Sequence, residues 1–311
     1  AKSRKAFGQS ISDFGSIQDK LATSAILTYT LDSTCYSVIG KQTEAINELD
    51  KNDPEYYVKQ GNTTEQYIAE NSIVKVYGSE AAEELIDHCF QIYGGYGFIE
   101  EYPMAQAYRD NRINKIWEGT NEINRMLCGR AMITKALSGE IGFKEYLEKV
   151  DVYCNNGLDS GYEGDLKTEV ECVEAAKAVY AICLNESLSK HGQDIGTEQV
   201  IIENLANILI YAYVGDSTLS RVIQNKDLYV QKNQVVPELC AKVYTAEQGI
   251  RVMEYANKIL NSIYDGEIPK ELESKFAKLS KRLSLSTDTI GLKKIIGEKV
   301  VEAGGYPVQS F

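Results

Sequence analysis

Apolar residues recur every three or four positions along most of the chain, which is the period of an α-helix. Two segments show this pattern clearly. The apolar positions of residues 14–50 include Ile17, Leu21, Ala25, Tyr29 and Tyr36. Those of residues 65–92 include Ile68, Ile73, Val76 and Leu85. Little of the sequence alternates with the period of two that a half-buried strand requires. The pattern therefore predicts an all-α fold.

Polar and glycine-rich breaks divide this helical pattern. Residues 50–64 contain Pro54 and Gly61, which predicts a loop, and a further helix is expected from about 121 to 137. Glycine-rich stretches at 137–143 and 155–167 mark a domain boundary. We predict an antiparallel helical bundle without a β-sheet in residues 1–138, a linker at 139–164 and a second helical domain at 165–311. The helices expected in that second domain are 166–190, 197–225, 236–264, 267–283 and 286–302.

Composition narrows the classes of function. The 311 residues are 43% hydrophobic and 25% charged, which is typical of a globular protein. The net charge of −12 and the lack of a basic face argue against nucleic-acid binding. No apolar run reaches the length of a transmembrane segment, and no secretory signal is visible. The opening "AKSRKAFG" resembles the middle of a longer protein, so we expect a fragment.

Cysteine and histidine are poorly placed for metal binding. The seven cysteines are scattered without a C-x-x-C pair, which favours free thiols in a reducing compartment. Only two histidines are present, His88 and His191, so a zinc site or a Ser-His-Asp triad is disfavoured and no metal site is predicted. His88 lies in a helical pattern and is expected to be an ordinary helix residue.

Candidate chemistry is concentrated in residues 88–125. Taken singly, each feature has a structural explanation. The pair Gly94–Gly95 can cap a helix, Arg109–Asp110 can be a surface pair, and Glu118 can be a solvated loop residue. The run "GGYG" does not fit a G-x-G-x-x-G nucleotide loop, and no predicted strand precedes it.

Taken together, these residues resemble a known family. The runs "QIYGGYGF" (91–98) and "RDNRINKIWEGTNEINR" (109–125) resemble the C-terminal signature of the acyl-CoA dehydrogenases. "RKAFGQSI" (4–11) resembles that family's R-x-x-F-G-x-x-I segment. The resemblance covers residues 1 to about 137. "DFGSIQDKLA" (13–22) and the helical extension beyond residue 140 are similar to the very-long-chain branch, which carries an additional C-terminal helical domain.

The resemblance implies α,β-desaturation of acyl-CoA thioesters with FAD, as in fatty acid β-oxidation. Glu118 matches the catalytic base. An α-C–H beside a thioester is a weak acid. The base must therefore be a carboxylate whose pKa rises when bound ligand excludes water. Trp117 and Gly119 match substrate-binding positions, as an apolar wall and a close-approach turn. The family's oxyanion hole uses the backbone N–H of the base residue and a flavin ribose hydroxyl.

The resemblance also implies cofactor contacts. Those to the FAD of a neighbouring subunit are Arg4, Phe7, Gln91, Gly94 and Gly95. Thr120 and Glu122 match positions beside the subunit's own FAD, and Arg109 with Asp110 is interpreted as support for the Glu118 loop. The expected partners are acyl-CoA, electron-transfer flavoprotein as electron acceptor, and further copies of the chain in a dimer or tetramer.

The sequence departs from the family pattern at several points. Ala6 stands where many members have threonine, and Trp117 replaces a commoner tyrosine or phenylalanine. Relatives of the isovaleryl type place the base on another helix. The family's N-terminal helical domain and middle β-domain are absent, so we expect this fragment alone to be inactive.

Other functions remain open. One alternative is a non-catalytic scaffold or assembly factor derived from the same family, and another is a helical dimerisation module. Flavin content separates the enzyme from both. The expected location is the bacterial cytoplasm, with the mitochondrial matrix as the alternative.

Overall fold

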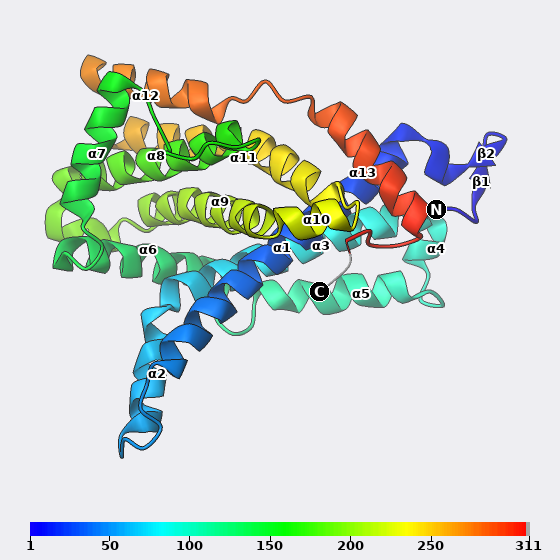
Figure 1. Ribbon diagram of the computed structural model, residues 1–311, viewed down its shortest axis with the longest axis horizontal. Coiled ribbons are helices and arrows are strands. Elements are labelled where there is room, and N and C mark those ends of the chain that lie inside the picture. Colours follow the sequence, from blue (N-terminus) through cyan, green and yellow to red (C-terminus); the bar gives the residue numbers. More distant parts are fainter. Residues whose placement is uncertain (309–311) are drawn as a thin grey trace.

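Helices make up nearly all of the regular structure. The computed structural model describes residues 1–308. The six longest helices are α1 (Gly15–Asn47), α3 (Ile68–Tyr93), α6 (Asn121–Ser138), α8 (Lys167–His191), α9 (Gln199–Gln224) and α11 (Val236–Ile263). The shorter ones are α2 (Tyr56–Gln66), α4 (Gly95–Phe98), α5 (Pro103–Arg112), α7 (Phe143–Asn156), α10 (Lys226–Gln231), α12 (Lys270–Leu283) and α13 (Thr289–Ala303). Figure 1 shows their arrangement, and the predicted all-α class is confirmed.

A short β-hairpin precedes the first helix, so the expectation of no sheet in residues 1–138 is wrong in this detail. Strand β1 (Lys5–Ala6) pairs antiparallel with β2 (Gln9–Ser10). The two linking residues, Phe7 and Gly8, have φ of 51° and 86°. Two consecutive left-handed residues form the tight turn that suits a two-residue hairpin loop. Strands of two residues are too short to leave an alternating pattern in the sequence.

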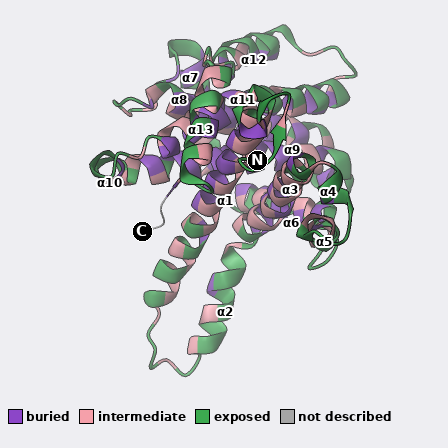
Figure 2. Cartoon of the chain, turned by 90° about the vertical axis from the view of Figure 1, so that its right-hand side faces the viewer, coloured by how far each residue is buried: buried purple, intermediate pink, exposed green. Residues whose placement is uncertain are grey.

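The predicted loop at 50–64 is wrong from residue 56 onward, where helix α2 begins. Pro54 lies just before this helix, and Gly61 lies inside it. Helix α2 and the C-terminal part of α1 extend together away from the body of the molecule (Figures 1 and 2). Tyr36, expected on the buried face of α1, is 67% exposed. Apolar periodicity marked the helix correctly but not where its packing ends.

Two clusters of buried side chains form the core. One contains residues of α6, α7, α8, α9, α11 and α12. The other combines residues of the N-terminal helices α1 and α3 with residues of α9, α11 and α13. In that second cluster, Tyr29 and Ile73 are packed together with Cys240 and Ile296. The last helix, α13, packs along the first, α1. Helices from both ends of the chain therefore share one core.

The division of the chain at 139–164 stays a prediction. Helix α7 lies within the predicted linker, and its Phe143, Val150 and Cys154 are buried. After it, residues 157–166 form no helix, although Leu158 and Leu166 are buried at the two ends of this stretch.

Limited proteolysis tests this division. We expect the first cuts between Leu137 and Lys167, in the exposed stretch 161–165 that surrounds half-buried Tyr162, because a protease needs mobile, accessible backbone. The fragments are identified by mass spectrometry. First cuts inside residues 197–225, which α9 protects, would contradict the division.

Candidate functional site

Glu118 lies on the loop that joins α5 to α6, directly after the short 3₁₀ helix Ile113–Lys115. Glu118 and Gly119 have φ of 53° and 75°, so the chain turns sharply at two consecutive left-handed residues. At position 119 a Cβ would lie 3.0 Å from Nδ2 of Asn124, which explains glycine there. A glutamate in the left-handed region is uncommon and persists only where its surroundings hold it.

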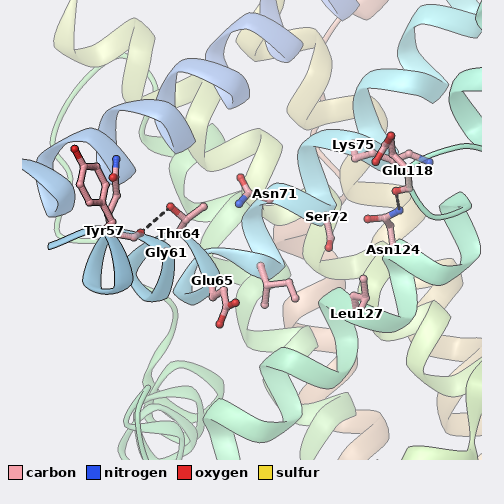
Figure 3. A pocket seen from close by; sticks show the side chains of 12 residues that line it. Tyr57, Gly61, Thr64, Glu65, Asn71, Ser72, Lys75, Glu118, Asn124 and Leu127 are labelled. Carbon is pink, nitrogen blue, oxygen red and sulfur yellow. Dashed lines mark hydrogen bonds between the residues drawn. The ribbon is translucent and has the colours of Figure 1, made fainter. Parts of the chain in front are cut away.

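Asn124 and Lys75 hold this loop by its carbonyl oxygens. The Asn124 side-chain amide donates to the carbonyls of Glu118 (3.3 Å), Gly119 (2.8 Å) and Thr120 (3.1 Å). The Lys75 ammonium, which comes from α3, donates to the Gly119 carbonyl at 2.6 Å. Figure 3 shows Lys75 and Asn124 next to Glu118. The turn is therefore fixed from two helices.

Asn121 connects the loop more deeply to α3. Its Oδ1 accepts from Lys75 Nζ at 2.7 Å. Its Nδ2 donates to the Ser79 hydroxyl at 2.9 Å and to Glu80 Oε1 at 3.1 Å. Asn121 is 2% exposed, so these bonds are shielded from water and satisfy an otherwise costly buried amide. Lys115, just before the loop, forms an ion pair with Glu83 of α3.

None of these supporting roles was predicted from the sequence. Asn121 and Asn124 stand within the motif that singled out Glu118, so two asparagines directly after a Glu-Gly turn were a usable signal. Lys75 and Ser79 lie on α3, far from the loop in sequence. Their contact with the loop depends on how α3 packs against α6.

Helix α6 begins at this turn. The Thr120 hydroxyl accepts from the backbone N–H of Ile123 at 3.3 Å and so caps the helix. Hydrogen bonds from its own backbone N–H and from the Thr120 hydroxyl lower the pKa of Glu122, and Arg125 and Lys75 add to this. Burial lowers the pKa of Lys75, while Glu122 and Glu80 oppose that effect. The helix start thus holds an anionic carboxylate beside the loop.

Glu118 faces a groove of about 730 Å³ between α2, α3 and α6. Its walls mix polar and apolar side chains, among them Tyr57, Thr64, Ile68, Ser72 and Leu127. In Figure 3, Glu118 lies at one end and Tyr57 of the extended helix α2 at the other. Trp117 is 55% exposed beside Glu118. The groove is long, open and large enough for an elongated small molecule.

A second group of predicted residues gathers around the β-hairpin. The Arg4 guanidinium donates to the Tyr93 carbonyl at 3.2 Å and lies 5.5 Å from the ring centre of Tyr96. Gly94, with φ of 60°, lies beneath it, and a Cβ there would be 3.5 Å from Arg4. Phe7 is 97% exposed, and Gln91 and Gly95 are exposed as well.

These two groups are separate. Helix α5, ten residues and so about 15 Å long, lies between the α4 end and the Glu118 loop (Figure 1). Arg4 and Gly94 therefore lie together beside the hairpin. Glu118 lies with Trp117, Thr120 and Glu122 at a different place.

Arg109 and Asp110 do not support the Glu118 loop as interpreted from the sequence. Arg109 donates to Glu100, ahead of α5, at 2.9 Å. Both side chains are more than two-thirds exposed, and such a pair contributes little to stability. Asp110 is exposed too. The support comes from Lys75, Asn121 and Asn124.

Replacing Asn124 by aspartate tests this support. The change puts a carboxylate oxygen against three carbonyl oxygens and removes the side-chain amide that donates to them. We expect the free energy of unfolding to fall by about 1–3 kcal/mol, measured by urea titration. The control is Asn261→Asp, since exposed Asn261 donates to a single carbonyl within its own helix, and that change is expected within about 0.5 kcal/mol of zero. Equal effects of both variants would contradict the proposed anchoring.

Comparison with protein families accounts for most of the chain. A family model described as the acyl-CoA dehydrogenase C-terminal domain matches residues 1–133. A second model with the same description matches residues 175–275. The first match contains the Glu118 loop and the β-hairpin, and the second contains α9. The chain belongs to the acyl-CoA dehydrogenase family.

Individual relatives agree with this assignment. A probable acyl-CoA dehydrogenase of Bacillus subtilis (strain 168) is 28% identical over 309 residues, which are 99% of this chain and 52% of that protein. The mitochondrial very long-chain specific acyl-CoA dehydrogenase of Bos taurus is 32% identical over 241 residues, which are 71% of this chain and 34% of that protein. The chain thus spans between about a third and a half of these relatives.

A solved structure shares the whole arrangement of helices. It is the acyl-CoA dehydrogenase complexed with FAD from Bacillus anthracis, 29% identical, with a TM-score of 0.90. The alignment covers 99% of this chain and 52% of that one. Both the bundle and the helices that follow it therefore belong to this family's architecture. Within residues 1–308, no helix is both long and apolar enough to cross a bilayer.

Proposed function

We propose that this chain is the C-terminal portion of an FAD-dependent acyl-CoA dehydrogenase that desaturates acyl-CoA thioesters between the α and β carbons, as in fatty acid β-oxidation. The observation that carries this proposal is the position of Glu118. A carboxylate stands on a sharply turned loop, fixed by Asn124 and Lys75, at the end of a groove. Membership of the family supports the general reaction.

Each residue of the loop has a task in this reaction. Glu118 removes the α-proton of the thioester as general base. Its backbone N–H donates to the thioester oxygen, where negative charge develops. Gly119 lets the chain approach the thioester closely, and Trp117 forms part of the apolar wall that excludes water around the carboxylate. Because Asn124 and Lys75 bind the loop's carbonyls, the carboxylate keeps its direction without reorganising.

The residues around the β-hairpin fit a flavin nucleotide. When bound, FAD accepts the hydride that leaves the β carbon. Arg4 supplies a cation, and the turn at Gly94 and Gly95 presents backbone without side chains, which suits close contact with a phosphate-bearing group. Phe7 and Gln91 are exposed beside them and offer further contact. Thr120 and Glu122, at the start of α6, are the proposed contacts to the subunit's own FAD.

We further propose that the whole protein is a dimer or tetramer. Apolar side chains gather at the α4 end and are exposed: Tyr93, Tyr96, Phe98, Ile99 and Tyr102. Such a patch beside Arg4 and Gly94 supports a neighbouring subunit whose FAD these residues contact. Electron-transfer flavoprotein is the proposed electron acceptor, on the basis of the family resemblance. The bacterial cytoplasm is the proposed location, supported by the Bacillus relatives.

Flavin content tests the proposed function. The full-length protein, purified without added cofactor, is expected to carry FAD in about equimolar amount, measured by absorbance after release. A correctly folded full-length protein that neither carries nor takes up FAD would contradict the proposal. That result would instead favour the scaffold alternative.

A further inference from the structure

We propose that the appended helical unit orients the catalytic loop through a continuous chain of hydrogen bonds, with Asn207 of α9 as the outermost positioning residue. The catalytic part of this inference rests on the function proposed above. The inference assigns a task to helix α9, which lies about ninety residues beyond Glu118 in the sequence.

The chain of bonds runs from α9 to the carbonyl that follows Glu118. Asn207 Oδ1 accepts from Arg125 Nε on α6 at 2.6 Å. The terminal nitrogens of Arg125 bind both carboxylate oxygens of Glu80 on α3, each at 2.9 Å. Glu80 Oε1 then accepts from Asn121 Nδ2 at 3.1 Å.

The last two steps reach the loop itself. Asn121 Oδ1 accepts from Lys75 Nζ at 2.7 Å, and the same ammonium donates to the Gly119 carbonyl at 2.6 Å. Asn121 thus receives its orientation from Glu80 and transfers it to Lys75. Each amide can bond in this way with only one orientation of its oxygen and nitrogen.

The planar side chain of Arg125 couples the orientation of Asn207 to that of Glu80. A guanidinium is planar and rigid, so the two bonds to Glu80 and the bond from Nε to Asn207 together fix its orientation. The Arg125 side chain is 13% exposed and Asn207 is 9% exposed. Hydrogen bonds that involve a charge are stronger than neutral ones, and more so when shielded from water.

Close packing of α6 on α9 keeps Asn207 in register with Arg125. Gly129 lies four residues after Arg125, on the same face of α6. A Cβ at position 129 would lie 2.4 Å from Cγ2 and 3.2 Å from the carbonyl oxygen of Ile202 on α9. The backbone of α6 at Gly129 therefore contacts the Ile202 side chain of α9, one helical turn away from the Arg125–Asn207 bond. A shift of α9 along α6 would move Asn207 relative to Arg125.

Hydrogen exchange in the full-length protein tests the proposal independently of activity. The variant Asn207→Leu keeps the size of the side chain and removes the acceptor. Backbone amides of Trp117 and Asn124 are bonded to the carbonyls of Ile113 and Thr120 at 3.0 and 2.9 Å, so they report opening of the loop. We expect their exchange to accelerate about tenfold, the scale of one lost hydrogen bond.

Two further variants separate positioning from general destabilisation. Asn207→Asp retains an oxygen acceptor for Arg125. In this variant, the hydrogen-exchange rate of the peptide 113–127, which contains the Trp117 and Asn124 amides, is expected to stay within about twofold of the parent. Asn204→Leu is the matched control on α9, because in the described part of the chain its side-chain amide bonds the Val200 carbonyl of its own helix. It is also expected to leave peptide 113–127 unchanged. Amides of α8 serve as an internal reference in every variant.

Activity provides the second readout. In Asn207→Leu, kcat for acyl-CoA is expected to fall about tenfold with KM within about twofold, because a misaligned base slows chemistry more than binding. Unchanged exchange of the loop in Asn207→Leu, or equal acceleration in α8, would overturn the positioning role. Faster exchange of the loop alone, in a protein that never oxidises acyl-CoA, would retain the structural link and reject the proposed function.

Discussion

Replacing Glu118 by glutamine in the full-length protein is expected to lower acyl-CoA turnover by about two to four orders of magnitude, the usual scale for losing a general base. Glutamine keeps the shape of the side chain and much of its hydrogen-bonding capacity, but it cannot accept the α-proton. The backbone turn at 118–119 is held by the carbonyls, not by the carboxylate, so the loop stays in place. FAD and acyl-CoA are expected to bind nearly as in the parent.

The matched control for this variant is Glu101→Gln. Glu101 is exposed between α4 and α5 and is not among the residues proposed to contact substrate or cofactor. Its turnover is expected to equal that of the parent. Steady-state rates and ligand titrations on both variants provide the comparison. A Glu118→Gln enzyme with parental turnover would place the base elsewhere, as in the relatives whose base lies on another helix.

The substitution Gly297→Ala is expected to destabilise the protein by about 1–3 kcal/mol, although alanine is the better helix former. Gly297 is buried in α13, where that helix crosses α1. An added Cβ would lie 2.6 Å from the carbonyl oxygen of Gln18 and 2.9 Å from its Cβ. Since these atoms belong to the backbone and its first side-chain carbon, α13 has to move away from α1.

The same change made at Gly40 is the control. Gly40 lies inside α1, and among residues 1–308 nothing beyond its own turn of helix stands within 4 Å of the position that a Cβ would take. Gly40→Ala is therefore expected to stabilise the protein by up to about 1 kcal/mol. Chemical unfolding of the two variants measures both effects. Stabilisation by Gly297→Ala would mean that α13 does not pack on α1 as described.

Most of the helices could be predicted from the sequence because their apolar period is local information. The pattern predicted a helix at 197–225, and α9 spans Gln199–Gln224. It predicted 236–264, and α11 spans Val236–Ile263. Helix α2 was missed because its sequence from Lys59 onward is polar and contains Gly61, and because its buried residue, Thr63, is polar too. Helix α7 was missed because glycines on either side suggested a linker.

The candidate site was predictable only in part. The motif around Glu118 located the start of α6 and singled out the proposed base. The resemblance implied that Arg4 and Gly94 contact the same neighbouring FAD, and the two do lie together, with Arg4 bonded to the Tyr93 carbonyl. The residues that fix the loop come from separate helices, so no local pattern could reveal them. Lys75 and Glu80 resemble ordinary charged positions of a helix until the fold sets them against Asn121.

The most direct test of the account is a single-turnover reaction of the full-length, flavin-loaded protein with a saturated acyl-CoA in the absence of oxygen. The account predicts that the oxidised flavin absorbance bleaches and that an equivalent amount of α,β-unsaturated acyl-CoA forms, both greatly slowed in Glu118→Gln. An intact protein whose flavin stays oxidised with short-, medium- and long-chain acyl-CoA, or one bleached at the parental rate without the Glu118 carboxylate, would contradict it.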